Sequence, residues 1–187
     1  MKSVAVLYCT PASIYKSLAL ECFDQYRDAR TYAGWLPVVA HPPCRSWGRL
    51  RHLAKPVAWE RALGLHAVQQ VRRCGGVLEH PAGSLLWSDL PEFGAYPLPA
   101  VGAGVDAFGG QTISVYQSDF GHPAPKHTWL YVVGARPGEL CKAVRAGDLC
   151  KAARPGGLRK VAYQPSARRM DTPLPFAELL LSIAEAV

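Results

Sequence analysis

The sequence predicts a single α/β domain in which helices cover a sheet of buried strands. Two observations lead to this expectation. Short apolar segments rich in β-branched and aromatic residues recur along the chain, and stretches with helical spacing of apolar residues lie between two of them and at the C-terminal end. Near-continuous apolar runs are typical of strands that are buried on both faces. At 187 residues the chain is long enough for one domain with a substantial core.

Five segments are expected as strands, because each is apolar and is bounded by glycine, proline or polar residues. In chain order they are residues 4–8, 37–41, 75–79, 113–117 and 128–133. A helix is expected over residues 57–74, where Gly75 and Gly76 supply the stop. A second helix is expected over residues 175–186, with prolines at its start, where proline is tolerated.

Two stretches are expected to lie outside the sheet. Residues 88–110 are rich in glycine and proline, which predicts a long surface excursion. Residues 135–170 carry many arginines and lysines against only two acidic residues, Glu139 and Asp148. This basic insert is the segment that we expect to contact a phosphate backbone.

Charge and cysteine usage indicate the partner and the compartment. The formal net charge is +7, from 21 basic and 14 acidic residues. A basic surface attracts polyanions, so DNA is the expected partner.

The six cysteines show no C-x-x-C spacing, which argues against a metal cluster and a disulfide framework and favours a reducing cytoplasm. No segment reaches the roughly 18 apolar residues of a membrane span, so no membrane association is expected.

A thiol follows the second expected strand. That strand ends at His41, and two prolines then deliver Cys44 into a loop at the carboxyl edge of the sheet, where α/β folds place their sites. Arg45, Arg49 and Arg51 follow closely, and positive neighbours are expected to lower the pKa of the thiol. The alternative is a buried structural cysteine.

A carboxyl group ends the next expected strand. Glu79 precedes His80 and Pro81, so adjacent strand ends would present a carboxyl beside the Cys44 thiol. This pair suits covalent activation of a pyrimidine: the thiolate adds to ring carbon 6, the acid donates to ring nitrogen 3, and carbon 5 becomes nucleophilic. The alternative for Glu79 is a helix-cap or salt-bridge carboxylate.

Three ordered motifs resemble those of the cytosine-5 DNA methyltransferases. Residues 42–48, Pro-Pro-Cys-Arg-Ser-Trp-Gly, resemble the family's nucleophile loop Pro-Pro-Cys-Gln-x-Phe-Ser. Residues 79–81, Glu-His-Pro, stand where the family has Glu-Asn-Val, at about the family's separation. Residues 120–131 resemble its Tyr-Gly-x-Pro-Gln-x-Arg-x-Arg segment, with Lys126 and Thr128 at the two arginine positions.

The resemblance implies a Rossmann-like methyltransferase sheet with helices on both faces. It also implies a cytosine that is flipped out of DNA into a pocket. It implies Cys44, Glu79 and Lys126 as the catalytic residues. The base-binding residues that it implies are Pro43, Arg45, Ser46, His80, Pro81, His122 and Thr128. The residues expected to contact DNA are Arg49, Arg51, Lys142, Arg145, Lys151, Arg154, Arg159 and Lys160. A small DNA-modification enzyme of this kind would suit a bacterial or phage-infected cytoplasm.

The resemblance divides the domain into four parts. Residues 1–40 correspond to a reduced cofactor side, 41–134 to the catalytic core, 135–170 to the DNA-contacting insert, and 171–187 to the C-terminal helix. The family binds S-adenosylmethionine at a glycine-rich turn, Phe-x-Gly-x-Gly, but here no glycine precedes Gly34. The remaining candidates for cofactor contact are Tyr8 and Asp24, although Asp24, like Asp28, can also be a charge on a surface helix.

Four interpretations stay open. The chain holds S-adenosylmethionine in a divergent way, uses another one-carbon donor such as methylenetetrahydrofolate to hydroxymethylate cytosine, or binds flipped bases without turnover. A hydrolase that pairs Cys44 with His41 or His80 is a fourth, with no further support in the sequence. A homo-oligomer or a partner chain would be one way to complete the cofactor site.

Overall fold

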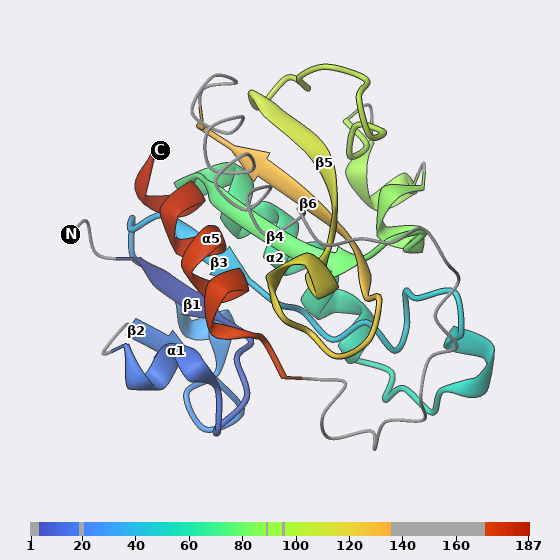
Figure 1. Cartoon of the computed structure of the whole chain (residues 1–187). Helices are drawn as coiled ribbons and strands as arrows, with labels where there is room; N and C mark the ends of the chain where they lie inside the picture. The colour runs from blue at the N-terminus through green and yellow to red at the C-terminus, as the bar shows by residue number, and fades with distance from the viewer. Residues whose placement is uncertain (1–3, 19–20, 89, 95, 136–170) are drawn as a thin grey trace.

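The computed structural model describes residues 4–18, 21–88, 90–94, 96–135 and 171–187. These residues form an α/β fold around a six-stranded mixed sheet (Figure 1) with the strand order β2-β1-β3-β4-β6-β5. The strands are β1 (Ala5–Leu7), β2 (Glu21–Phe23), β3 (Val38–Ala40), β4 (Gly76–Pro81), β5 (Gly110–Tyr116) and β6 (His127–Val133).

The sheet is mixed, with four neighbouring strands paired in parallel and the other two strand pairings antiparallel. β2, β1, β3 and β4 pair in parallel, whereas β6 is antiparallel to both β4 and β5. The chain passes from β1 outward to β2 and then returns to β3 on the other side of β1. Such a reversal of strand order is the place where open α/β sheets bind ligands, at the carboxyl ends of the strands.

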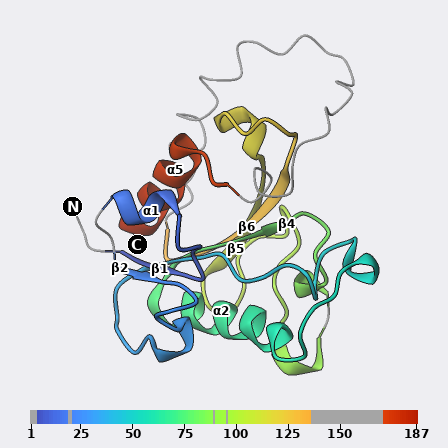
Figure 2. The ribbon, with the colours of Figure 1, turned by 90° about the horizontal axis from the view of Figure 1, so that it is seen from below.

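Helices cover both faces of the sheet. Figure 2 shows α1 (Ile14–Ser17) and α5 (Leu174–Glu185) on one face and α2 (Glu60–Cys74) on the other. Side chains of a strand alternate between faces, so Val77 of β4 packs in the core beneath α5 and Leu78 packs in the core beneath α2. By the same alternation Glu79 lies on the α5 face and His80 on the α2 face.

The expected elements are present with small changes at their ends. The five predicted strands correspond to β1, β3, β4, β5 and β6, and the two predicted helices to α2 and α5. The helix α2 ends where predicted, at Gly75, which has a φ of 75°. Two elements, α1 and β2, were not predicted, because each is very short and β2 begins with the polar Glu21.

The two irregular stretches have different outcomes. Within the described part of residues 88–110, the regular structure is a single 3₁₀ turn (Pro91–Phe93) and the first residue of β5, as expected. Of the expected basic insert, only Ala135 lies among the described residues. The DNA contacts expected at Lys142, Arg145, Lys151, Arg154, Arg159 and Lys160 therefore fall outside the described residues. No helix in the described ranges has the length and apolar character needed to cross a membrane.

Candidate active site

Four strand ends meet at one edge of the sheet. β3 and β4 are parallel neighbours, so their carboxyl ends bring the segment that carries Cys44 beside Glu79. β6 runs the opposite way, so its first residues lie at this edge too, where Thr128 pairs with Pro81. β5 ends there as well. The three motif segments, far apart along the chain, therefore converge on a single edge.

The loop that carries Cys44 is anchored by Trp47. The amide groups of Trp47 and Gly48 donate to the Cys44 carbonyl at 3.0 and 2.8 Å. The Trp47 indole is fully buried against α2, where a Cβ on Gly64 would come within 2.6 Å of its ring nitrogen. The carbonyl of Trp47 accepts from the Leu85 amide at 2.9 Å. The loop is thus fastened to the helix and to the segment after β4.

The Cys44 thiol differs from the sequence expectation. Although the residue is exposed, desolvation by the surrounding protein raises the pKa of the thiol, and the charge of Glu79 raises it further, against weaker opposing effects of Lys126 and Arg45. Arg45 lowers the pKa of the thiol as predicted, but burial and the charge of Glu79 outweigh this effect, and Arg45 also forms an ion pair with the buried Glu60 of α2. The resting side chain is therefore a thiol at neutral pH.

Glu79 is a buried carboxylate with two donors. The Gln117 side-chain amide donates to Oε1 at 2.9 Å, and His41 Nδ1 lies 3.0 Å from Oε2. Burial raises the pKa of Glu79, but Lys126 and the hydrogen bond with His41 outweigh it, and the pKa falls to about 2. Glu79 is consequently ionised across the physiological range.

Lys126 supplies the positive charge of the site. Its ammonium group acts electrostatically on Cys44, Glu79 and His80. The Lys126 carbonyl accepts from the Gln117 amide at 2.9 Å, and this bond joins the end of β5 to the segment before β6. The structure thus brings together all three of the predicted catalytic side chains, Cys44, Glu79 and Lys126.

The remaining predicted base-binding residues lie around this cluster with different roles. Thr128 is fully buried, and its hydroxyl accepts from Gln117 at 3.1 Å. His122 is buried in the turn before β6, where its Nδ1 accepts from the Ala124 amide at 3.1 Å. Pro43, Ser46 and Pro81 are half-buried, and Arg45 is exposed. The hydrogen bonds of Thr128 and His122 therefore stabilise the local structure of the site.

His80 lies on the other face of the sheet from Glu79. It is fully buried, and its ring centroid is 6.4 Å from that of Trp87. Burial lowers the pKa of His80 to about 4, against the opposing effects of the Glu79 charge and of an interaction with the Pro43 backbone in the Cys44 loop. A neutral imidazole on the opposite face suits support of the Cys44 loop better than direct contact with the base.

Two residues of the site, Gln117 and Tyr15, were not predicted from the sequence, and His41 was considered only as a partner of Cys44. His41 and Gln117 hold Glu79, and Tyr15 of α1 holds His41 with a hydroxyl 3.0 Å from Nε2. His41 carried a detectable signal, since it is a polar residue at the end of an apolar strand. Gln117 and Tyr15 carried none, because their positions depend on the register of β5 against β6 and on the packing of α1.

The carboxyl end of β1 does not form an open turn. Tyr8 has a φ of 65°, the only positive value at a non-glycine residue in the described ranges, and its hydroxyl lies 2.6 Å from His66 Nδ1 on α2. The amide of the next residue, Cys9, donates to the Phe23 carbonyl at 3.1 Å. This left-handed conformation is strained for tyrosine. The turn after β1 is therefore closed onto β2.

Asp24 is also engaged within the protein. It follows β2 directly, and Asp28 caps a 3₁₀ turn, so the expectation that these are charges on a surface helix was wrong. Asp24 forms an ion pair with Lys16 and accepts from the amides of Tyr26 and Arg27, which together lower its pKa to about 2. Tyr8 and Asp24 thus do not fit a glycine-cradled S-adenosylmethionine with an acidic ribose partner.

The described residues include no group of three or more His, Cys, Asp or Glu side chains that could hold a metal ion. No model of a known protein family, no curated protein and no solved structure matches the chain.

Proposed function

We propose that this chain modifies carbon 5 of a flipped cytosine in DNA through a covalent adduct between Cys44 and ring carbon 6. The observation that carries the proposal is the convergence of three motif segments on one sheet edge, with Cys44, Glu79 and Lys126 in one electrostatic cluster. The proposal includes a methyltransferase-type sheet, which the parallel core and the carboxyl-edge site support.

The protonation states of the two reactive groups complement each other. Cys44 holds a proton that must leave before sulfur can attack, and Glu79 lacks the proton that an acid must give. In the proposed step the thiol proton passes to Glu79 and on to ring nitrogen 3 as the sulfur–carbon 6 bond forms. The electron pair of the carbon 5–carbon 6 double bond moves to the carbon 4–carbon 5 bond as the carbon 4–nitrogen 3 double bond opens, which makes carbon 5 the nucleophile. After carbon 5 has taken up the one-carbon group, it loses its proton, and cleavage of the sulfur–carbon 6 bond restores Cys44. Lys126 would stabilise negative charge that develops on the pyrimidine.

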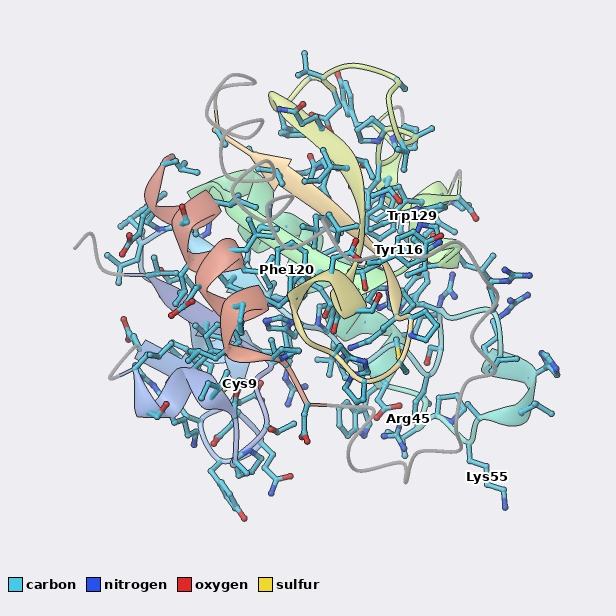
Figure 3. All side chains as sticks on the ribbon, viewed as in Figure 1. Cys9, Arg45, Lys55, Tyr116, Phe120 and Trp129 are labelled. Carbon is cyan, nitrogen blue, oxygen red and sulfur yellow. The ribbon has the colours of Figure 1, made fainter. Side chains whose placement is uncertain are left out.

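The segment after Cys44 suits contact with DNA. Arg49, Arg51 and Lys55 are exposed, and Figure 3 shows Lys55 projecting from the rim of the molecule. Leu50 and Leu53 are 69% and 72% exposed between these cations. Cations neutralise phosphates, and apolar side chains beside them can contact bases or sugars. The segment would hold the strand that delivers the base to Cys44.

Covalent trapping tests the proposal. The protein is incubated with DNA containing 5-fluorocytosine and, in separate reactions, S-adenosylmethionine or methylenetetrahydrofolate. We expect a protein–DNA adduct that peptide mass spectrometry maps to Cys44, that Cys44→Ser abolishes and that Glu79→Gln reduces strongly. Mass spectrometry of nucleosides from unmodified DNA then separates 5-methylcytosine from 5-hydroxymethylcytosine. DNA binding without an adduct under either donor would contradict the proposed chemistry.

A second candidate is the binding of a flipped base without turnover. It is favoured by the hydrogen bond of Tyr8 with His66 and by the ion pair of Asp24 with Lys16, because both residues expected to contact a nucleoside donor are engaged within the protein. This candidate predicts that Cys44→Ser binds DNA as tightly as the unchanged protein and that neither donor yields a modified nucleoside. Measurement of DNA affinity by fluorescence anisotropy, together with the nucleoside analysis, separates the two candidates.

A further inference from the structure

A buried row of polar groups lies behind Glu79. Tyr15 is 1% exposed, and its hydroxyl lies 3.0 Å from His41 Nε2. The other ring nitrogen of His41, Nδ1, lies 3.0 Å from Glu79 Oε2. The Tyr15 and His41 rings also pack at a centroid distance of 5.3 Å. Three elements, α1, the end of β3 and β4, thus meet in one hydrogen-bonded series.

The direction of these hydrogen bonds follows from the ionisation of Glu79. A carboxylate is acceptor-only, so His41 Nδ1 has to carry a hydrogen and donate it. In neutral imidazole the other nitrogen then has a lone pair, and the Tyr15 hydroxyl can donate to it. The row therefore selects one of the two neutral tautomers of His41, with the hydrogen on Nδ1.

We infer that His41, oriented by Tyr15, is a positioning residue that holds Glu79 as an ionised carboxylate in the orientation needed to take up the Cys44 proton. The inference rests on the proposed function and adds to it two residues that belong to none of the three motif segments. Gln117 fixes the second carboxylate oxygen at 2.9 Å, so that Glu79 is held from both sides.

Other charged and titratable groups also act on Glu79 and have to be separated from His41. Cys44 comes from the loop after β3, His80 from β4, Lys126 from the segment before β6 and Tyr15 from α1. Lys126 acts on the carboxylate through charge. His41 acts through a directed hydrogen bond, so its contribution depends on a donor at the Nδ1 position rather than on positive charge.

The first test determines which ring nitrogen of His41 carries the hydrogen, and it requires no DNA. Nitrogen-15 NMR of the histidine rings is recorded above the pH at which imidazole titrates, and the His41 signals are assigned by their loss in His41→Asn. We expect hydrogen on Nδ1 and a bare Nε2 that loses its hydrogen bond in Tyr15→Phe. Tyr32→Phe is the matched control, because it removes another buried tyrosine hydroxyl, one that donates to Leu36 on the other face. Hydrogen on Nε2 of the unchanged protein would overturn the inference.

The second test follows the titration of Glu79. In His41→Asn the side-chain amide can donate from near the Nδ1 position, whereas His41→Ala leaves no donor. Loss of a hydrogen bond to a charged group shifts the pKa by about one unit or more. We expect the carbon-13 signal of the Glu79 carboxyl to titrate about one pH unit higher in His41→Ala than in the unchanged protein, and His41→Asn to lie closer to the latter. Equal midpoints in natively folded variants would overturn the inference.

The third test asks whether the hydrogen bonds that link Tyr15, His41 and Glu79 affect the rate of adduct formation. The rate of 5-fluorocytosine trapping is measured against pH with whichever donor supports it, and its acidic limb is expected to move upward by the same amount in His41→Ala but not in His41→Asn. Failure of the unchanged protein to form any adduct would count against the proposed function, while the NMR tests still decide the role of His41. Normal trapping in the unchanged protein with an identical pH profile in His41→Ala would reject the positioning role alone.

Discussion

Replacing Glu79 by glutamine should change the pH dependence of folding by an amount that follows from the structure. The residue is 8% exposed, and the pKa of its side chain lies at about 2 in the fold, against 4.5 for a free glutamate. Its folded pKa is depressed, so the stabilisation is present above pH 4.5 and is lost as pH falls through about 2. A difference of this size corresponds to roughly 3 kcal/mol of unfolding free energy.

Urea unfolding followed by tryptophan fluorescence measures this effect. The difference in unfolding free energy between the unchanged protein and Glu79→Gln is expected to grow by roughly 3 kcal/mol between about pH 2 and pH 5, and to stay constant above it. Glu178→Gln on α5 is the matched control, since Glu178 is exposed. A difference that does not vary with pH would refute the reasoning that His41 and Lys126 hold Glu79 ionised.

Two further predictions concern the Cys44 loop. Glu79→Gln removes a charge that raises the pKa of the Cys44 thiol, so iodoacetamide should alkylate Cys44 faster at pH 8. Lys126→Met removes a charge that lowers this pKa and should slow alkylation. Peptide mass spectrometry measures both rates. Gly64→Ala places a Cβ 2.6 Å from the Trp47 ring and should cost about 1–3 kcal/mol in urea unfolding while exposing the loop to limited proteolysis. Unchanged stability in Gly64→Ala would show that Trp47 does not anchor the loop there.

The apolar core of the sheet could be predicted from the sequence, because buried strands and helices leave a clear periodic pattern. The segments at Cys44 and Glu79 could also be placed, since the carboxyl ends of neighbouring parallel strands lie at one edge. The reversal of β6 could not, because strand direction leaves no trace in a short apolar run. The net shift of the Cys44 pKa could not be predicted from the neighbouring arginines, because burial of the thiol and the charge of Glu79 raise the pKa by more than Lys126 and Arg45 lower it.

The register of β5 and β6 gives this site two structurally separable halves. The parallel strands and the loop after β3 supply the nucleophile, the acid and His41. The antiparallel pair and the segment that connects its strands supply Gln117, Lys126 and Thr128, which also act on the charge state and the orientation of that acid. Changes within residues 110–133 would therefore alter the surroundings of the acid and, through Lys126, the charge that acts on the Cys44 thiol. Residues 110–133 can therefore be varied as one segment in directed evolution, while the sequence of the parallel strands stays fixed.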